Sequence, residues 1–310
     1  MSNYGFSITD EAVIQKQIHR KKIKEFFDSL QKCTLKKNNL LENAVYDKYD
    51  NINELFLHNC YLESFPEDIT YILNKVTKLW LSQNKLTKLP STMHYLKSVR
   101  SIWLNQNLFE DIPNLPLNIE SLYLHENVHL CNIVKISTYT NLKELYLHEC
   151  SISEIPDSIQ YLTTLIQLDL HGNSICKVNP NLFKLKTLQK LYLHGNNIIE
   201  IPKNIKDCLS LWFLTLHYNQ LTELPEEFGE LEYLQRLSLH HNVLKTLPKS
   251  FAKLSTHIKA LSLFSNELED IDDDILRGLT QNCDNIAIYN NKFPPTKDFS
   301  ILSTIKNVKI

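Results

Sequence analysis

The sequence predicts an α/β solenoid whose coils each give one strand to a parallel, concave β-sheet and a mostly irregular, 3-10 or short helical segment to the convex side. Two observations predict this fold. The pattern L-x-x-L-x-L-x-x-N-x-L recurs nearly end to end in the 310 residues, with successive copies 20 to 25 residues apart. The composition, with 43% hydrophobic and 22% charged residues, does not shift along the chain, which favours one elongated unit.

The clearest copy of the pattern is LQKLYLHGNNI, from Leu188 to Ile198, and its residues define positions 1 to 11. Position 9 falls at Asn38, Cys60, Asn84, Asn107, Asn127, Cys150, Asn173, Asn196, Asn219, Asn242, Asn266 and Asn291. Because side chains alternate along a strand, positions 4 and 6 are predicted to fill the interior and positions 3, 5 and 7 to face outward. The amide at position 9 is predicted to satisfy backbone groups of neighbouring coils, and cysteine fits the same slot.

Proline occupies position 15 in seven repeats, namely Pro66, Pro90, Pro113, Pro156, Pro202, Pro225 and Pro248. Its fixed φ predicts that the chain turns there onto the convex side.

This consensus resembles that of the leucine-rich-repeat family from Leu30 to Phe293. Segments such as EIPDSIQYLTTLIQLDLHGNSI look like the 23-residue class of intracellular signalling scaffolds, and that resemblance implies an arc that binds proteins. The copy between Asn107 and Asn127 is 20 residues long, and its IPNLPLNIESLYL is similar to repeats of effectors that bacterial pathogens deliver into host cells. Two interpretations therefore stay open: a scaffold or adaptor, and a secreted effector that modulates a host signalling protein.

Both ends of such a stack need polar caps. Residues 1–29 are predicted to form the N-terminal cap, with a helix over residues 10–29 where apolar residues recur at near-helical spacing. Twelve repeats are predicted over residues 30–293. Residues 294–310, which begin with Pro294 and Pro295, are predicted to cap the other end with a short helix or turn.

Charge and cysteine usage narrow the function classes. Lys+Arg 33 against Asp+Glu 35 gives a net charge of −2, so we expect no nucleic-acid partner. There is no apolar run of 18 residues, so we expect no membrane span. The seven cysteines are scattered through the chain, with Cys33 at an interior strand position, which predicts reduced thiols and a cytoplasmic location in the producing cell or in a host.

The outward positions of the strands carry the candidate site. Position 5 holds large aromatic residues in five successive repeats, and position 7 holds histidine in six successive repeats from His125 to His240. The predicted partner-binding residues are Phe56, Trp80, Trp103, Tyr123, His125, Tyr146, His148, Asp169, His171, Tyr192, His194, Phe213 and His217. Exposed aromatic residues are typical of protein interfaces. Stacked imidazoles are expected to repel one another when charged, which predicts that partner affinity changes between neutral and mildly acidic pH.

An acidic centre at Glu126, Glu144, Glu149 and Asp169, flanked by Lys78, Lys190 and Arg236, favours a partner with a basic segment. Zinc accepts histidine and carboxylate ligands, but a uniform row of histidines selects no particular place for a metal. No phosphate loop, HExxH, GxSxG or CxxC motif is present. The sequence therefore predicts a protein-binding module with no catalytic residue, metal or cofactor, and a metal-binding or hydrolytic site in the histidine row is the minor alternative.

Overall fold

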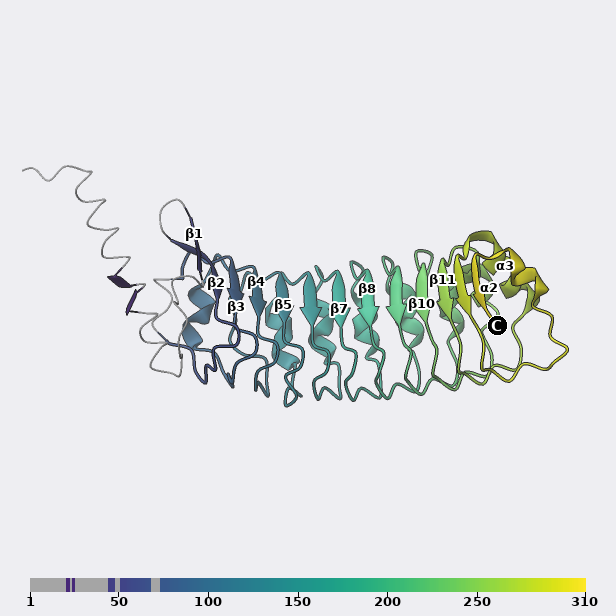
Figure 1. Ribbon diagram of the computed structural model, residues 1–310, viewed down its shortest axis with the longest axis horizontal. Coiled ribbons are helices and arrows are strands. Elements are labelled where there is room, and N and C mark those ends of the chain that lie inside the picture. The colour runs from purple at the N-terminus through teal and green to yellow at the C-terminus, as the bar shows by residue number, and fades with distance from the viewer. Residues whose placement is uncertain (1–20, 23, 26–43, 48–50, 68–72) are drawn as a thin grey trace, which may run out of the picture. The chain divides into compact units, whose positions relative to one another are not determined.

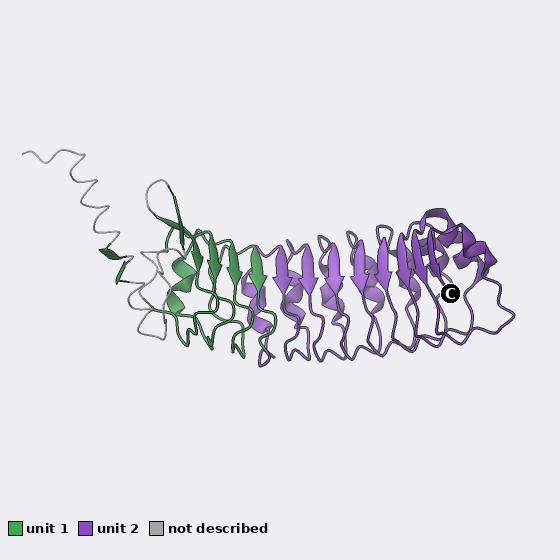
Figure 2. Ribbon diagram, in the orientation of Figure 1, with its two compact units in different colours: residues 1–127 green, residues 128–310 purple. Residues whose placement is uncertain are grey.

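The computed structural model describes residues 21–22, 24–25, 44–47, 51–67 and 73–310. Its contacts divide the chain into two compact units, residues 1–127 and residues 128–310 (Figure 2). Each unit is a stack of coils in which short strands alternate with helical or extended segments (Figure 1). The predicted solenoid is confirmed.

Unit 1 contains five described strands and one 3-10 helix. They are β1 (Ala44–Tyr46), β2 (Ile52–Phe56), β3 (Lys78–Trp80), η2 (Ser91–Tyr95), β4 (Ser101–Trp103) and β5 (Ser121–Tyr123). Strands β2 to β5 pair in parallel and in register, so that Phe56 lies beside Trp80 and Trp80 beside Trp103. The sequence did not predict that β1 pairs antiparallel with β2, at the edge of an otherwise parallel sheet.

Unit 2 continues the same alternation with eight strands. They are β6 (Glu144–Tyr146), β7 (Gln167–Asp169), β8 (Lys190–Tyr192), β9 (Phe213–Thr215), β10 (Arg236–Ser238), β11 (Ala260–Ser262), β12 (Asn285–Ala287) and β13 (Asn307–Lys309). All neighbouring pairs from β6 to β13 are parallel. In this unit too, equal positions of successive repeats lie side by side.

The helical segments of unit 2 lie on the side of the coils opposite to the strands (Figure 1). They are the 3-10 helices η3 (Val134–Thr138), η4 (Asp157–Tyr161), η5 (Pro180–Lys184), η6 (Lys203–Asp207), η7 (Glu226–Glu230) and η8 (Ser300–Thr304), with the α-helices α2 (Phe251–Ser255) and α3 (Asp273–Asn282). The longest, α3, has 10 residues. In the described part of the chain, no helix combines the length and the apolarity that a membrane crossing needs.

Burial follows the predicted alternation of the strands. Leu145 and Leu147, at positions 4 and 6 of one repeat, are 0% exposed, whereas Tyr146 between them is half-buried. The same holds in unit 1, where Ile102 and Leu104 are 0% exposed on either side of Trp103. The core of each unit is therefore a column of leucine and isoleucine side chains inside the coils, and position 5 lies outside it.

Proline at position 15 stands where the chain turns onto the convex side, as the sequence predicted, and in four repeats it also precedes a 3-10 helix. Pro90, Pro156, Pro202 and Pro225 each precede the first residue of a 3-10 helix, with φ between −71° and −60° and extended ψ. Pro113 differs, because no helix follows it before β5. The 20-residue repeat has room for an extended connection in place of the convex helix.

Asparagine at position 9 bonds the backbone of two successive coils. The Asn219 Nδ2 donates to the carbonyl oxygens of Leu216 at 2.9 Å and Leu193 at 3.0 Å, and its Oδ1 accepts from the amide of Ile198 at 2.9 Å. Its side chain is nearly covered, with 8% exposure for the residue. Asn84, Asn173, Asn196, Asn242 and Asn266 repeat this pattern. The predicted role of the amide is confirmed.

Position 8, just before this asparagine, takes left-handed backbone. The residues with positive φ there include Asn59, Gln83, Gln106, Glu126, Glu149, Gly172, Gly195, Tyr218, His241, Ser265 and Asn290. Glycine adopts this conformation without a steric penalty, whereas other residues are held in it by their surroundings. The turn that leaves each strand therefore begins one residue earlier than the asparagine.

Several predicted features fall on residues outside the described ranges. Of the predicted helix over residues 10–29, Lys21, Lys22, Lys24 and Glu25 are described, and they are helical. The first repeat, with Asn38 at position 9, and Cys33 lie outside the described residues. At the other end, residues 294–310 contain η8 and also the strand β13, which pairs with β12.

Candidate functional site

Four aromatic side chains of unit 1 form a continuous stack on the sheet face, the face formed by the outward positions of the strands. We call Phe56, Trp80, Trp103 and Tyr123 the aromatic column. Ring centroids of successive members are 4.3, 4.4 and 4.9 Å apart, with interplanar angles of 21°, 5° and 8°. Parallel strands about 4.8 Å apart hold equal positions at a distance suited to ring stacking. All four residues are half-buried, so the rings face outward in the register that the sequence predicted.

Charged and polar groups lie close to the aromatic column. The Lys78 ammonium is 3.1 Å from Glu54 Oε1 and lies 5.9 Å from the centroid of the Trp80 ring. At the other end of the column, the His125 ring meets Tyr123 edge to face at 6.5 Å. Glu126, the member of the predicted acidic centre that belongs to unit 1, accepts from Gln106 Nε2 at 2.7 Å.

Unit 2 carries a second stack, built from imidazole rings. We call His148, His171, His194, His217 and His240 the imidazole column. Successive ring centroids are 4.4, 4.3, 4.2 and 4.2 Å apart, and the planes differ by 8° to 15°. Phe264 and Tyr289 extend the same stack at 4.3 and 4.6 Å. The column is continuous because position 7 of each repeat lies beside position 7 of the next.

In two members of the imidazole column, a hydroxyl group at position 5 contacts the inner ring nitrogen, Nδ1. His194 Nδ1 is 2.9 Å from Thr215 Oγ1, and His240 Nδ1 is 3.1 Å from Ser262 Oγ. In both pairs the hydroxyl belongs to the following repeat. The Nε2 edge of these rings is therefore the edge left for contacts on the sheet face.

Burial makes these imidazoles hard to protonate. It lowers the pKa of His194 to about 4 and that of His217 to about 3, and repulsion from neighbouring imidazoles acts in the same direction. Burial and the nearby His241 lower the pKa of His240 to about 4. These directions are those expected of a stacked, mutually repelling set.

Asp169 lies beneath the imidazole column, where sequence reasoning placed a residue for partner contact. It is 7% exposed, and its carboxylate accepts from His171 Nδ1 at 2.6 Å and from the His171 amide at 3.2 Å. Its second oxygen is 3.4 Å from His148 Nδ1. Burial alone would raise the pKa of Asp169, but the hydrogen bonds with His148 and His171 bring it well below its usual value. The carboxylate is therefore engaged by its own column and is mostly inaccessible to a partner.

The aromatic residues of unit 2 stand on both sides of Asp169. Tyr146 Oη accepts from Gln167 Nε2 at 3.1 Å, and burial raises the pKa of Tyr146 to about 12. Tyr192 packs against Phe213 with ring centroids 5.0 Å apart and an angle of 43°. Both tyrosines and Phe213 are half-buried on the sheet face.

The remaining charged residues of the predicted acidic centre behave differently from Asp169. Glu144 is half-buried, and the Glu149 side chain is 60% exposed. Lys190 places its ammonium 5.5 Å from the centroid of the Trp212 ring, and Arg236 is exposed. Unit 2 thus presents accessible acidic groups on β6 and its following turn, and basic groups on β8 and β10.

Comparison with known proteins decides the family. Residues 140–198 and 163–221, which overlap, match the family described as Leucine rich repeat. The chain contains leucine-rich repeats. Among curated proteins, no relative matches the sequence. Leucine-rich-repeat stacks offer extended binding surfaces and generally mediate protein–protein interaction.

Solved leucine-rich-repeat structures share the fold. A leucine-rich-repeat protein of Leptospira interrogans is 26% identical with a TM-score of 0.68, and the match covers 84% of this chain and 73% of that one. The leucine-rich repeats of FLRT2, from an octameric complex with Latrophilin 3 and Unc5D, are 26% identical with a TM-score of 0.72, covering 86% and 82%. An internalin from Listeria monocytogenes is 20% identical with a TM-score of 0.60, covering 84% and 87%, and shows likeness of fold alone.

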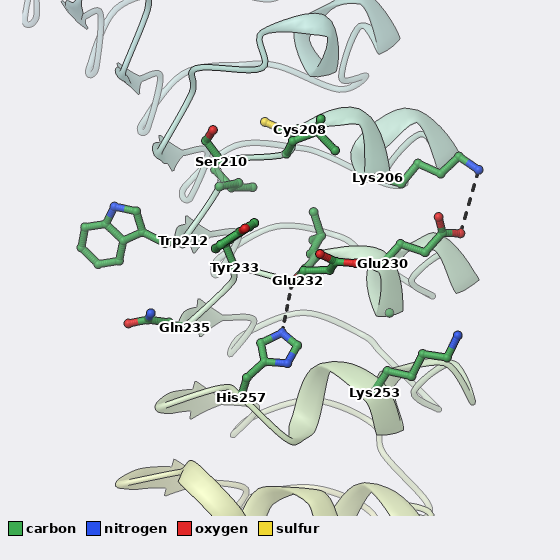
Figure 3. Close-up of a pocket in the computed structure, with 14 residues that line it drawn as sticks. Lys206, Cys208, Ser210, Trp212, Glu230, Glu232, Tyr233, Gln235, Lys253 and His257 are labelled. Atoms are coloured by element: carbon green, nitrogen blue, oxygen red, sulfur yellow. Dashed lines mark hydrogen bonds and ion pairs between the residues drawn. The ribbon is translucent and has the colours of Figure 1, made fainter.

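Sequence reasoning missed a groove at the edge of the leucine-rich repeats of unit 2, where the convex segments lead into β9 and β10 (Figure 3). Its volume is about 1010 Å³, and Trp212, Tyr233 and Leu209 line it. Tyr233 and Leu209 are 63% and 57% exposed, and an ion pair of 3.9 Å between Lys206 and Glu230 closes one side. The residues between the convex helix and the strand vary from repeat to repeat, so periodicity alone does not reveal this groove.

Proposed function

We propose that this leucine-rich-repeat protein is a protein–protein interaction module that binds a partner protein on its sheet face, as a scaffold or adaptor without catalysis. The observation that carries the proposal is the aromatic column, in which four half-exposed rings stack in register. A contiguous apolar surface of this kind marks an interaction site more often than it covers a core. Tryptophan and tyrosine are also the residues that contribute most to binding energy at protein interfaces.

Stacking prepares these rings for binding. A ring that is already held between two neighbours loses little conformational freedom when a partner covers it, so more of the contact energy appears as affinity. Trp80 and Trp103 occupy the middle of the column and are the proposed anchors. The FLRT2 repeats, which share the fold, are part of an assembly with two other proteins, and this supports the proposal by analogy.

The sheet face of unit 2 supplies contacts of another kind. The outer edges of the imidazole column offer donors and acceptors that adapt to a partner, and Tyr146, Tyr192 and Phe213 add aromatic surface. Glu144 and Glu149 favour a partner that carries a basic segment there, because complementary charge steers association. The partner-binding residues predicted from the sequence are retained in this proposal, except that Asp169 acts from beneath His148 and His171.

The proposed location is the cytoplasm. Cys60, Cys208 and Cys283 are buried with free thiols, and Cys60 fills an asparagine slot, where its Sγ contacts the His58 carbonyl oxygen at 3.4 Å. Such positions use cysteine as a small apolar residue and need it reduced. The 23-residue repeats favour the intracellular scaffold class.

The second candidate is a bacterial effector that binds and modulates a host signalling protein. The extended 20-residue repeat before β5 favours it, as does the likeness to a Leptospira interrogans protein. The two candidates predict the same binding face and differ in the cell in which the partner is found.

Quantitative affinity capture tests the proposal. Wild-type protein is compared with the Trp80→Ala/Trp103→Ala variant and with Tyr161→Ala, whose exposed side chain lies at the end of η4, away from the strands. We expect one or more proteins to be enriched on the wild type and on Tyr161→Ala and lost from the double variant. Equal enrichment on all three would refute binding through the aromatic column. Running the capture with extracts of the producing organism and of animal cells separates the scaffold from the effector.

A further inference from the structure

One repeat of unit 2 has an acidic residue at position 5 of the sheet face. Position 5 is aromatic, hydroxylated or small in the other repeats, and Asp169 is its one carboxylate in the twelve copies of the pattern. This carboxylate lies under two imidazoles at once, with oxygen–nitrogen distances of 2.6 Å to His171 Nδ1 and 3.4 Å to His148 Nδ1. The histidine row is therefore not uniform, because these two rings have a carboxylate beneath them, whereas His194 and His240 have hydroxyl groups of Thr215 and Ser262 there.

Asp169 sets which ring nitrogen is available. An ionised carboxylate accepts hydrogen bonds and does not donate, so the nitrogens that face it carry the hydrogen. In a neutral imidazole the lone pair is then on Nε2, at the outer edge of each ring. Protein histidines that bind metals commonly donate their other N–H to a carboxylate in this way, and the carboxylate orients the ring and makes it a better ligand.

A third donor lies beside the outer edge. The Glu149 carboxylate, which is mostly exposed, has its Oε1 3.9 Å from His171 Nε2. The left-handed backbone of Glu149, with φ 54°, belongs to the turn directly after β6. The following repeat has Gly172 at the equivalent position, and a Cβ there would lie 3.1 Å from Glu149 Cγ. Because Gly172 has no side chain, the Glu149 side chain can occupy the space beside it.

We propose that His148 Nε2, His171 Nε2 and the Glu149 carboxylate bind a divalent first-row metal ion of the zinc class, with Asp169 as the supporting carboxylate. Two imidazoles and a carboxylate are a ligand set that zinc accepts, and a fourth position stays open for water or for a group of a partner. The site goes beyond the proposed function, because it requires no partner protein.

The rings must turn out of their parallel stack to close around an ion, because each Nε2 lone pair lies in the plane of its ring and the two planes are only 12° apart. Their centroids are 4.4 Å apart, whereas two nitrogens bound to one tetrahedral zinc at about 2.0–2.1 Å lie about 3.4 Å from each other. The proposed site therefore includes a rotation of both side chains that turns their outer edges toward one another and toward the Glu149 carboxylate. The side chains of His148 and His171 are 18% and 23% exposed, so the outer edges can be reached from solvent.

Direct ligation by Asp169 is the rival geometry, because one donor atom each of His148, Asp169 and His171 can be chosen within 4.8 Å of one another. The near-complete burial of Asp169 and its short contact with Nδ1 favour the outer arrangement. Long-range proton–nitrogen NMR of the zinc-loaded protein separates the two, because the metal then lies on Nε2 or on Nδ1.

The test is a titration of the full chain, prepared without a polyhistidine tag and stripped with a chelator, with zinc chloride and with cobalt chloride. We expect one ion per chain and visible cobalt absorption bands for the wild type. His148→Phe and His171→Phe keep an aromatic ring in the stack, as Phe264 does, and should lose both signals. Asp169→Asn should weaken zinc binding by about 10- to 100-fold, which is the usual effect of removing a supporting carboxylate.

Matched variants in the same column distinguish a defined zinc site from adventitious binding to the histidine row. His217→Phe and His240→Phe remove imidazoles that have no carboxylate beneath them among the described contacts, and they should bind zinc as the wild type does. Absence of stoichiometric binding to the wild type would overturn the site. Equal losses in all four phenylalanine variants would also overturn it, because they would show that the row binds metal without a defined place. Circular dichroism of each variant confirms that the coils are intact.

Discussion

The indole rings of Trp80 and Trp103 stack face to face, with centroids 4.4 Å apart and planes 5° from parallel. The two residues occupy the same position of successive repeats, on strands β3 and β4, which pair in register. Each ring limits the motion of the other without removing it from solvent. This pair therefore has the rigidity of a packed residue and the accessibility of a surface residue.

Replacement of Trp103 should weaken partner binding, and the loss should be smaller when the new side chain still has an aromatic ring. Trp103→Ala should cost about 2 kcal/mol in binding free energy, and Trp103→Phe should cost less because a stacked ring remains. Tyr146→Ala should cost a similar amount if Tyr146 is an anchor in unit 2. Isothermal titration with the captured partner measures these differences. Tyr95→Ala, at the end of η2, is the control, and a loss as large as that of Trp103→Ala would contradict the assignment.

Asn219 should matter for stability and not for binding. Asn219→Ala leaves the carbonyl oxygens of Leu193 and Leu216 and the Ile198 amide without their partner, so we expect about 3 kcal/mol less free energy of unfolding. Asn219→Cys should cost less, because cysteine occupies this slot at position 60. Urea unfolding compares both with Asn197→Ala, whose side chain is exposed. Equal midpoints for Asn219→Ala and Asn197→Ala would show that the slot bonds contribute little.

Acidification should destabilise unit 2 through the imidazole column. The ordinary imidazole pKa is 6.5, whereas burial lowers the pKa of His217 to about 3 and that of His240 to about 4. Below pH 6.5 the unfolded chain therefore takes up protons that the folded chain resists, and the free energy of unfolding falls as the pH goes down toward these values. Above pH 6.5 this contribution is complete. Urea unfolding at several pH values should show a smaller decline for His217→Phe/His240→Phe, and an unchanged decline would contradict the role of these two rings.

The cysteines should fall into two classes of reactivity. Burial raises the pKa of Cys208 to about 12 and also raises the pKa of the thiols of Cys60 and Cys283, whereas Cys131 and Cys176 are exposed. Alkylation of the native protein at neutral pH, mapped by peptide mass spectrometry, should modify Cys131 and Cys176 first. Rapid modification of Cys208 would show that its coil opens readily. Intact-mass analysis that finds several disulfides in native material would contradict the proposed cytoplasmic location.

The periodic part of the fold could be predicted from the sequence because each position has a fixed surrounding. In the described repeats, position 4 faces the interior and the asparagines at position 9 bond two backbones, so Leu145 and Asn219 could be placed by counting. Counting also placed Trp103 on the outer face. Such inferences need no knowledge of neighbouring side chains, because a given position always lies beside the same position of the adjacent repeat.

The features that could not be predicted depend on contacts between unlike residues. Asp169 shares a position with Tyr146 and Tyr192, but its carboxylate lies 2.6 Å from His171 Nδ1 and 3.4 Å from His148 Nδ1, and the register alone does not specify these contacts. The antiparallel pairing of β1 and the strand β13 lie where the repeat pattern is weak or absent. The edge groove at Trp212 and Tyr233 is formed by residues that differ in each repeat.

The hydrogen bonds from each asparagine amide to the preceding coil determine how such a chain can change in length. Each amide bonds a carbonyl oxygen of its own coil and one of the preceding coil, as Asn219 bonds Leu216 and Leu193. Every coil therefore offers the next coil the same carbonyl acceptor. Removal or duplication of a whole 23-residue segment, such as residues 197–219, leaves every remaining amide with two backbones to bond. Loss of only part of a segment shifts the register, so that some asparagine amides no longer meet two backbones. Whole-coil gain or loss is therefore the route by which this stack can be shortened or extended, while the side chains on its outer face are exchanged one coil at a time.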